Sequence, residues 1–214
     1  MVLAVMCVGY FLVLLDVTAL NVAVPAIGAG LGAGVTGLQW VVNGYALALA
    51  ALLLVGGALG DAYGHRRVVL AGLALFGAAS AGCGLAPTVG VLVAARVLQG
   101  VGAALLLPGT LAIITRTFPE PAAQARAIGV WAGVGSVALP AGPLLGGGLV
   151  ATWGWRSVFL VNVPVVLVAA LGTLRTVRSD RVTDPTSTST RWCVPCSVCC
   201  AGPRSRWPTP SPRR

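Results

Sequence analysis

Charged side chains are scarce in this chain of 214 residues. Asp, Glu, Lys and Arg together make up 9% of it, whereas 57% of the residues are hydrophobic and the mean hydropathy is +0.92. An ordinary soluble domain carries a charge on about 25% of its residues. The scarcity of charge therefore excludes a soluble globular domain and predicts a polytopic membrane protein.

Several patterns that bind cofactors or carry out catalysis are missing as well. The sequence contains no nucleotide-binding glycine loop, no nucleophile triad and no helix with metal-ligand spacing, so neither an ATP-driven pump nor an enzyme is supported. No cofactor is expected. The net charge of +9 does not indicate a nucleic-acid partner, because eight Arg and two Asp in residues 175–214 account for +6 of it.

Long apolar runs make up most of the sequence. Hydropathy predicts six membrane-spanning helices, each near the ~20 residues that a span requires, at roughly residues 3–25, 38–60, 67–86, 89–115, 125–150 and 156–175. Arginines collect after the second, fourth and sixth runs, whereas the opposite connections contain only Arg156. The positive-inside rule therefore predicts that the N-terminus and these three basic connections are cytoplasmic. The first run follows no basic residue and contains an aspartate, so we interpret it as a retained span and not as a secretory signal.

The connection between the second and third runs has the sequence Gly-Ala-Leu-Gly-Asp-Ala-Tyr-Gly-His-Arg-Arg, residues 57–67. Its glycines are expected to permit a tight turn, and its two arginines to hold one membrane face. The stretch resembles the loop between the second and third spans of major facilitator superfamily transporters, although Ala62 and His65 stand where that family usually carries basic residues. The resemblance implies a cytoplasmic gate loop with the residues Gly57, Gly60, Asp61, Gly64, Arg66 and Arg67.

Asp16 interrupts the first apolar run. A carboxylate near the centre of a membrane helix costs about 2.5–3.5 kcal/mol on insertion scales, so an acid at this position is by default a functional-site hypothesis. The alternative is that Asp16 serves only in helix packing. Residues 15–25, Leu-Asp-Val-Thr-Ala-Leu-Asn-Val-Ala-Val-Pro, resemble the first-span motif of the fourteen-span drug/proton antiporter branch of the superfamily.

Arg96 is the second charge inside an apolar run. With a rise of 1.5 Å per residue, Asp16 lies about 20 Å from the inner surface of a ~30 Å core, and Arg96 lies about 10 Å below the outer surface. The two residues are therefore at the same depth in the membrane. We therefore predict that the two face a common polar cavity and pair there, with Gln99 on the same face one turn from Arg96. Residues 92–104 resemble the fourth-span motif of the family, which implies that Arg96 takes part in proton coupling. The alternative is a purely structural arginine.

Other polar side chains are candidates for a substrate cavity. The candidates are Thr18, Asn21, Asn43 and Gln99. For the second run, the simpler interpretation is that Trp40 and Tyr45 anchor the outer membrane interface while a neighbouring amide forms a hydrogen bond between helices. By resemblance alone, the substrate would be an amphipathic toxin or antibiotic.

The fifth run contains Pro-Ala-Gly-Pro-Leu-Leu-Gly-Gly-Gly, residues 140–148. Glycines four residues apart make a face for close helix approach, and the prolines remove backbone donors, so packing alone would explain the pattern. The segment also resembles the fifth-span signature of antiporters in the superfamily, which implies export. Ala138 replaces a glycine of that signature. The matching positions are Gly142, Pro143, Gly146 and Gly147.

Residues 175–214 differ from the rest of the chain. We interpret residues 1–174 as the six-span bundle, and the basic, Pro/Ser/Thr/Cys-rich remainder as a frameshifted or truncated product, or else as a disordered tail that binds anionic lipid heads. The tail contains two C-x-x-C steps between Cys193 and Cys200. Their spacing departs from that of a ferredoxin, and no His is nearby, so no metal site is predicted.

Together these features predict an all-α membrane protein, the N-terminal half-bundle of a plasma-membrane transporter. Its predicted function is proton-coupled efflux of amphipathic drugs or antibiotics, with the proton gradient as the energy source. Alternating access requires two halves, so the partner would be a missing C-terminal half or a second copy in a parallel homodimer. The alternative is a non-transporting six-span module: a truncated remnant, a homodimer-forming half, or a cysteine-tailed binding protein.

Overall fold

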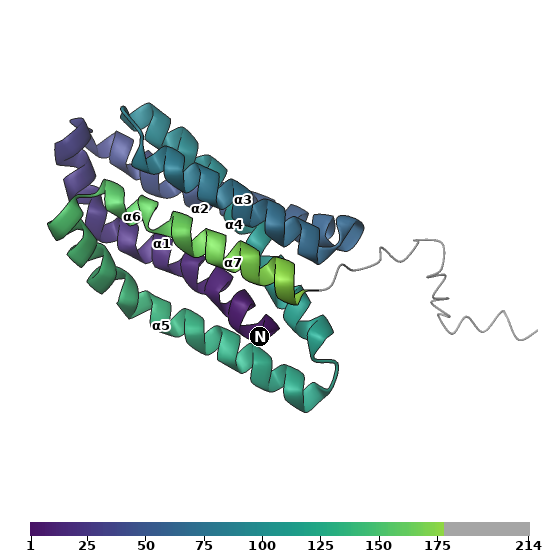
Figure 1. Cartoon of the computed structure of the whole chain (residues 1–214). Helices are drawn as coiled ribbons and strands as arrows, with labels where there is room; N and C mark the ends of the chain where they lie inside the picture. Colours follow the sequence, from purple (N-terminus) through teal and green to yellow (C-terminus); the bar gives the residue numbers. More distant parts are fainter. Residues whose placement is uncertain (178–214) are drawn as a thin grey trace, which may run out of the picture. The chain divides into compact units, whose positions relative to one another are not determined.

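The computed structural model describes residues 1–177, and every regular element in that range is an α-helix (Figure 1). The chain divides into two units, Met1–Val182 and Thr183–Arg214, and all of these helices belong to the first. The cysteines of the tail, at positions 193–200, lie outside the described residues.

Seven helices form this unit. They are α1 (Val2–Leu31), α2 (Val35–Tyr63), α3 (His65–Gly84), α4 (Val89–Thr117), α5 (Pro121–Trp153), α6 (Arg156–Leu160) and α7 (Asn162–Thr176). Five of them, together with the combined segment Arg156–Thr176, are long and apolar enough to cross a membrane. The predicted all-α, six-span fold is confirmed. Most of the helices extend a few residues beyond the apolar runs.

The sixth span is interrupted, which the sequence analysis did not predict. Leu160 ends α6 and Asn162 begins α7, with Val161 between them in a near-helical conformation (φ −64°, ψ −25°). Pro164 contributes to this break, because a proline has no N–H to donate to the carbonyl four residues earlier, here that of Leu160. The interruption is therefore local and leaves the span continuous in direction.

Gly64 makes the turn between α2 and α3. Its φ of 91° is one that L side chains rarely adopt. Gly57 and Gly60 lie inside α2, so the prediction that they shape the turn is wrong. The helical hydrogen bonds continue to the end of α2, where the Gly64 N–H donates to the Gly60 carbonyl at 3.0 Å. Gly60 instead leaves room for a side chain, because a Cβ there would lie 2.7 Å from His65 Cε1.

Helix α4 packs against α2 and α3, and α1 packs against α5 and α7 (Figure 1). Glycines let α4 approach closely: a Cβ at Gly100 would lie 2.5 Å from the Tyr45 carbonyl oxygen, and one at Gly102 would lie 2.8 Å from the Phe76 nitrogen. The buried apolar side chains form two clusters. Helix α1 contributes residues 6–13 to one cluster and residues 19–27 to the other. Asp16 lies between the two clusters, at the middle of the bundle.

The connections rich in arginine meet at one end of the bundle. The N-terminus and the end of α7 lie at this same end in Figure 1. There Arg116 Nη2 lies 3.6 Å from Asp61 Oδ1, and Arg66 Nη2 donates to the Leu174 carbonyl at 3.1 Å. Arg156 donates to the Ala86 carbonyl at the connection between α3 and α4 (3.3 Å). The two ends therefore differ in charge as the positive-inside argument requires. The direction of insertion remains a prediction.

Candidate functional site

The carboxylate of Asp16 accepts hydrogen bonds from three side chains. Arg96 Nη1 donates to Oδ2 at 2.5 Å, while Gln99 Nε2 and Asn162 Nδ2 each donate to Oδ1 at 2.8 Å. Asp16 and Arg96 are each 1% exposed. Donors from α4 and α7 thus satisfy both oxygens of a buried acid on α1.

The guanidinium of Arg96 is held on several sides. Its Nε donates to the Val41 carbonyl at 3.3 Å, and its Nη1 also donates to Gln99 Oε1 at 2.8 Å. The ring centroid of Tyr45 lies 4.2 Å from Cζ and that of Phe159 lies 5.9 Å away, both within cation–π range. The positive charge therefore has an anion, a carbonyl and two aromatic faces in place of water.

Gln99 connects this pair to α3. Its Nε2 donates to Ser80 Oγ at 2.9 Å, in addition to Asp16, and its Oε1 accepts from Cys83 Sγ at 3.6 Å, in addition to Arg96. The amide thus makes four contacts at once, so all of its polar atoms are used. The network therefore joins α1, α3, α4 and α7, and a shift of any one of these helices would disturb it.

Local sequence explains how the pair forms. Arg96 and Gln99 are three residues apart and share one face of α4. Gly100 comes next and lets α4 reach the α2 backbone at Tyr45, which places the Tyr45 ring over the guanidinium. An unpaired charge at this depth would be expensive, so the geometry that pairs the two residues is also the one that the apolar interior favours.

The structure brings Asp16 and Arg96 together, as their equal depths predict, but not in an open polar cavity. The pair is enclosed, and Arg96 borders a crevice of about 330 Å³ between α1, α2 and α4. The other residues lining that crevice are apolar, apart from Tyr45. Tyr45 is 2% exposed, so the prediction that it anchors the membrane interface is wrong. Its ring packs over the guanidinium of Arg96 inside the bundle.

The four predicted substrate-cavity residues do not converge on one point. Gln99 is fully buried in the network, and Thr18 donates to the carbonyl of Leu14 within its own helix at 3.0 Å. Asn21 and Asn43 are exposed on α1 and α2. A common substrate site for the four thus remains a prediction, and in the described half-bundle they have different surroundings.

Besides Tyr45, the sequence did not predict that four residues belong to the network: Ser80, Cys83, Phe159 and Asn162. Ser80, Cys83 and Phe159 have side chains that are common in membrane helices, so their type alone did not indicate a contact with the pair. Asn162 carried a detectable signal: an amide inside an apolar run must find a partner on a neighbouring helix. Its partner, Asp16, is 146 positions away in the chain.

The predicted gate loop contains a second, exposed ionic group. Asp61 Oδ1 lies 3.2 Å from His65 Nε2 and 3.6 Å from Arg116 Nη2, and the Asp61 side chain is 74% exposed. The Asp61–Arg116 pair is exposed on both sides, and such pairs contribute about 0–1 kcal/mol. These contacts, together with the Arg66 hydrogen bond to α7, connect α2, α3, α4 and α7 at the arginine-rich end. Arg67 is exposed, and the gate role of the loop remains a prediction.

Two of the four positions in the predicted antiporter motif contact α1. A Cβ at Gly142 would lie 2.6 Å from Thr18 Cβ, and one at Gly146 would lie 2.9 Å from Ala19 Cα, so both glycines are required for this approach. Gly147 has only ordinary contacts, and Pro143 is exposed. The motif therefore works at least as a packing surface, and its role in antiport remains a prediction.

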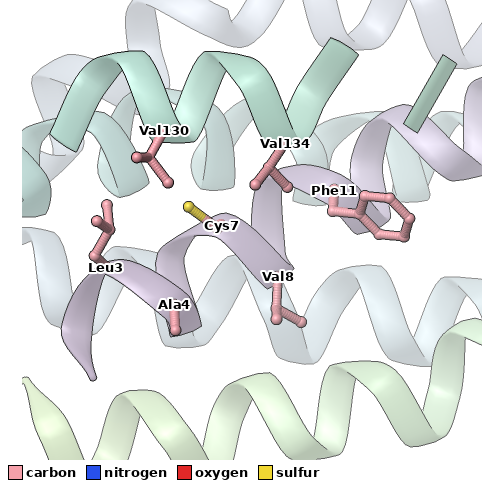
Figure 2. A pocket seen from close by; sticks show the side chains of 7 residues that line it. All are labelled: Leu3, Ala4, Cys7, Val8, Phe11, Val130 and Val134. Atoms are coloured by element: carbon pink, nitrogen blue, oxygen red, sulfur yellow. The ribbon is translucent and has the colours of Figure 1, made fainter. Parts of the chain in front are cut away.

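Toward the N-terminal end of α1, helices α1 and α5 line an open groove of about 400 Å³ (Figure 2). The side chain of Cys7 extends from α1 on the side of Val130 of α5 in this view. All the lining side chains are apolar or, for Cys7, weakly polar. Within residues 1–177 no cluster of His, Cys, Asp and Glu could hold a metal ion.

Comparison with known proteins gives the family. The model of the Major Facilitator Superfamily matches residues 6–200, a range that extends past residue 174. Multidrug resistance protein Stp of Mycobacterium tuberculosis (strain CDC 1551 / Oshkosh) is 46% identical over 157 residues, which are 73% of this chain and 29% of that protein. The tetracenomycin C resistance and export protein of Streptomyces glaucescens is 44% identical over 182 residues, 84% of this chain and 34% of that protein.

Solved structures show the same fold. A bacterial homologue of the human lysosomal transporter Spinster, inward-facing and unoccupied, superposes with a TM-score of 0.73 at 23% identity, covering 88% of this chain and 45% of that one. The inward-open xylose transporter XylE from E. coli superposes with a TM-score of 0.69 at 16% identity, and the match covers 83% of this chain and 47% of that one. The chain spans about 28–38% of the length of the curated relatives that it matches. The chain belongs to the major facilitator superfamily and corresponds to the N-terminal part of its multidrug and antibiotic efflux transporters.

Proposed function

We propose that this chain supplies the first six spans of a proton-coupled exporter of amphipathic drugs or antibiotics. The observation that carries the proposal is the buried Asp16–Arg96 pair, because an ionisable acid held inside a membrane bundle is the group expected in a proton pathway. Relatives named for multidrug resistance and for antibiotic export support the substrate class. The energy source would be the proton gradient across the plasma membrane.

The geometry suggests how a proton would be coupled to movement. An ionised Asp16 accepts three hydrogen bonds, and its charge attracts Arg96. Protonation would remove that charge and convert one acceptor oxygen into an O–H donor, so at least one donor would lose its partner. The contacts joining α1 to α4 and α7 would then weaken. Proton binding would thus act directly on the packing of helices that must move during alternating access.

A complete transporter would require a second half. In this superfamily two halves rock about a shared site near the middle of the membrane. The chain spans about a third of its curated relatives, so the remaining spans, or a second copy of this chain, would supply the other side of that site. We also propose that the N-terminus is cytoplasmic, which places the arginine-rich connections on that side.

A chimera tests the function directly. Residues 1–174 replace the matching segment of the tetracenomycin C resistance and export protein, and efflux of a fluorescent amphipathic cation is measured from vesicles with and without a proton gradient. We expect gradient-driven efflux by the chimera. We expect at least a tenfold loss of it in the Asp16→Asn variant, because Asn cannot exchange a proton.

The matched control is Glu120→Gln, which neutralises an exposed acid at the start of α5 and leaves Asp16 intact. Efflux by this control should keep its dependence on the gradient. A folded, membrane-inserted chimera that moves no dye, or an Asp16→Asn variant as active as the parent, would contradict the proposal and favour a non-transporting module.

A further inference from the structure

We infer that the interrupted sixth span positions the Asp16–Arg96 pair, with Asn162 as the residue that holds the carboxylate in place. Its Nδ2 donates to Asp16 Oδ1 at 2.8 Å, and the residue is 1% exposed. The other two donors, Arg96 and Gln99, both come from α4. Asn162 is thus the donor that ties the acid to a second helix.

The placement of Asn162 explains why it can act in this way. Asp16 Oδ1 accepts from Gln99 on one side and from Asn162 on the other, which leaves Oδ2 for Arg96. Two donors on one oxygen restrict rotation of the carboxylate about its Cβ–Cγ bond. Without Asn162, Oδ1 keeps only the Gln99 donor, so the carboxylate is held less firmly in the orientation that presents Oδ2 to Arg96.

The same span also contacts the other member of the pair. Phe159 lies three residues before Asn162, across the break at Val161, and its ring is 5.9 Å from Arg96 Cζ. Residues three apart share a helix face. One face of the sixth span therefore meets both the anion, through an amide, and the cation, through an aromatic ring.

The break itself favours this contact. Because Pro164 donates no hydrogen bond and α6 ends at Leu160, α7 begins anew at Asn162. A residue at the start of a helix has fewer neighbours from its own helix than one in its middle, so its short side chain can reach across to α1. The inference rests on the proposed function only in giving the pair a role in proton coupling; the positioning is independent of transport.

A test on the full 214-residue chain, purified and reconstituted in lipid nanodiscs, uses infrared spectroscopy. The carboxylate stretching band of Asp16 is assigned by its loss in Asp16→Asn. We expect Asn162→Leu, which keeps the same number of side-chain heavy atoms and the same branching but removes the donor, to shift that band. The matched control Asn43→Leu removes an exposed amide on α2 and should leave the band in place. Asn162→Ala is a second variant that loses the same donor and should shift the band in the same direction.

A double-mutant cycle separates positioning from packing. Asn162→Leu should lower the Tm of the parent chain, whereas in an Asp16→Leu background it should cause no further fall, because the acceptor is already gone. An equal fall in both backgrounds, or an unshifted Asp16 band in a folded Asn162→Leu or Asn162→Ala chain, would overturn the inference. Neither readout depends on transport, so an inactive chimera would contradict the proposed function and leave this inference standing.

Discussion

At the scale of the residue, burial decides what an ion pair contributes. Asp16 and Asp61 both approach a cation, but the Asp16 side chain is 0% exposed and that of Asp61 is 74% exposed. Water screens the Asp61 contacts, which contribute about 0–1 kcal/mol. Around Asp16 the loss of one partner would leave an uncompensated buried charge, and such a loss typically destabilises a protein by about 3–5 kcal/mol. An Asp–Arg pair at the surface can therefore be lost with little effect on stability, whereas at the centre of the bundle each partner requires the other.

The first prediction concerns Arg96→Leu. We expect this change to destabilise the chain by about 3–5 kcal/mol, because the Asp16 carboxylate remains buried without its cation. The double variant Asp16→Leu with Arg96→Leu should be destabilised less than Arg96→Leu alone, because no unpaired charge is left. Unfolding in detergent, followed by tryptophan fluorescence, measures both. Arg67→Leu, at an exposed arginine, is the control, and a similar loss in Arg67→Leu and Arg96→Leu would contradict the argument.

At the scale of the element, helix spacing depends on which glycines face a neighbour. Gly146 lies against the α1 backbone, where a Cβ would come within 2.9 Å of Ala19 Cα. Gly148 lies two residues further along α5, and a Cβ there would meet nothing within 4 Å. The two glycines are equivalent in helix propensity and differ in their surroundings. Close approach of α1 and α5 therefore requires glycine at one position and not at the other.

The second prediction compares Gly146→Ala with Gly148→Ala. We expect Gly146→Ala to destabilise the chain by about 1–3 kcal/mol, because α5 must move away from α1 to make room for the methyl group. Gly148→Ala should be neutral or stabilising by up to about 1 kcal/mol, since alanine favours the helix. The measurement is the Tm of each purified variant. Equal effects at the two positions would show that helix propensity, and not packing, sets the outcome.

At the scale of the whole molecule, the described helices correspond to a little under half of the solved transporter chains with the same fold. Their arginine-rich connections gather at one end, where Asp61, Arg66 and Arg116 connect the ends of α2, α3, α4 and α7. An even number of spans brings the N-terminus and the end of α7 to this same end (Figure 1). The charge difference between the two ends predicts the direction of insertion.

The third prediction is the orientation. Alkaline phosphatase is active only outside the cytoplasm, so a fusion after Gly34, between α1 and α2, should be active. A fusion after Gly64, between α2 and α3, should be inactive. Enzyme activity normalised to the amount of fusion protein in a bacterial host measures both. The reverse pattern would show that the arginine-rich connections face outward.

The sequence by itself determined the architecture and the two central charges. Six apolar runs predict six spans because each backbone must satisfy its own hydrogen bonds in lipid. The depths of Asp16 and Arg96 follow from counting residues along two helices, and their pairing follows from the cost of an isolated charge in the membrane. The motifs in the first, fourth and fifth runs and in the connection between the second and third runs were sufficient to indicate the family.

Only the tertiary structure decided which other side chains meet the pair. It placed Tyr45 and Phe159 around Arg96 and Asn162 on Asp16, and it placed Gly57 and Gly60 inside α2. The physical reason is that the rotation of a membrane helix about its axis leaves little trace in its sequence. In a soluble helix, water on one side and the core on the other create a polar and an apolar face. Here lipid and protein interior are both apolar, so the inward face becomes visible only when the helices pack.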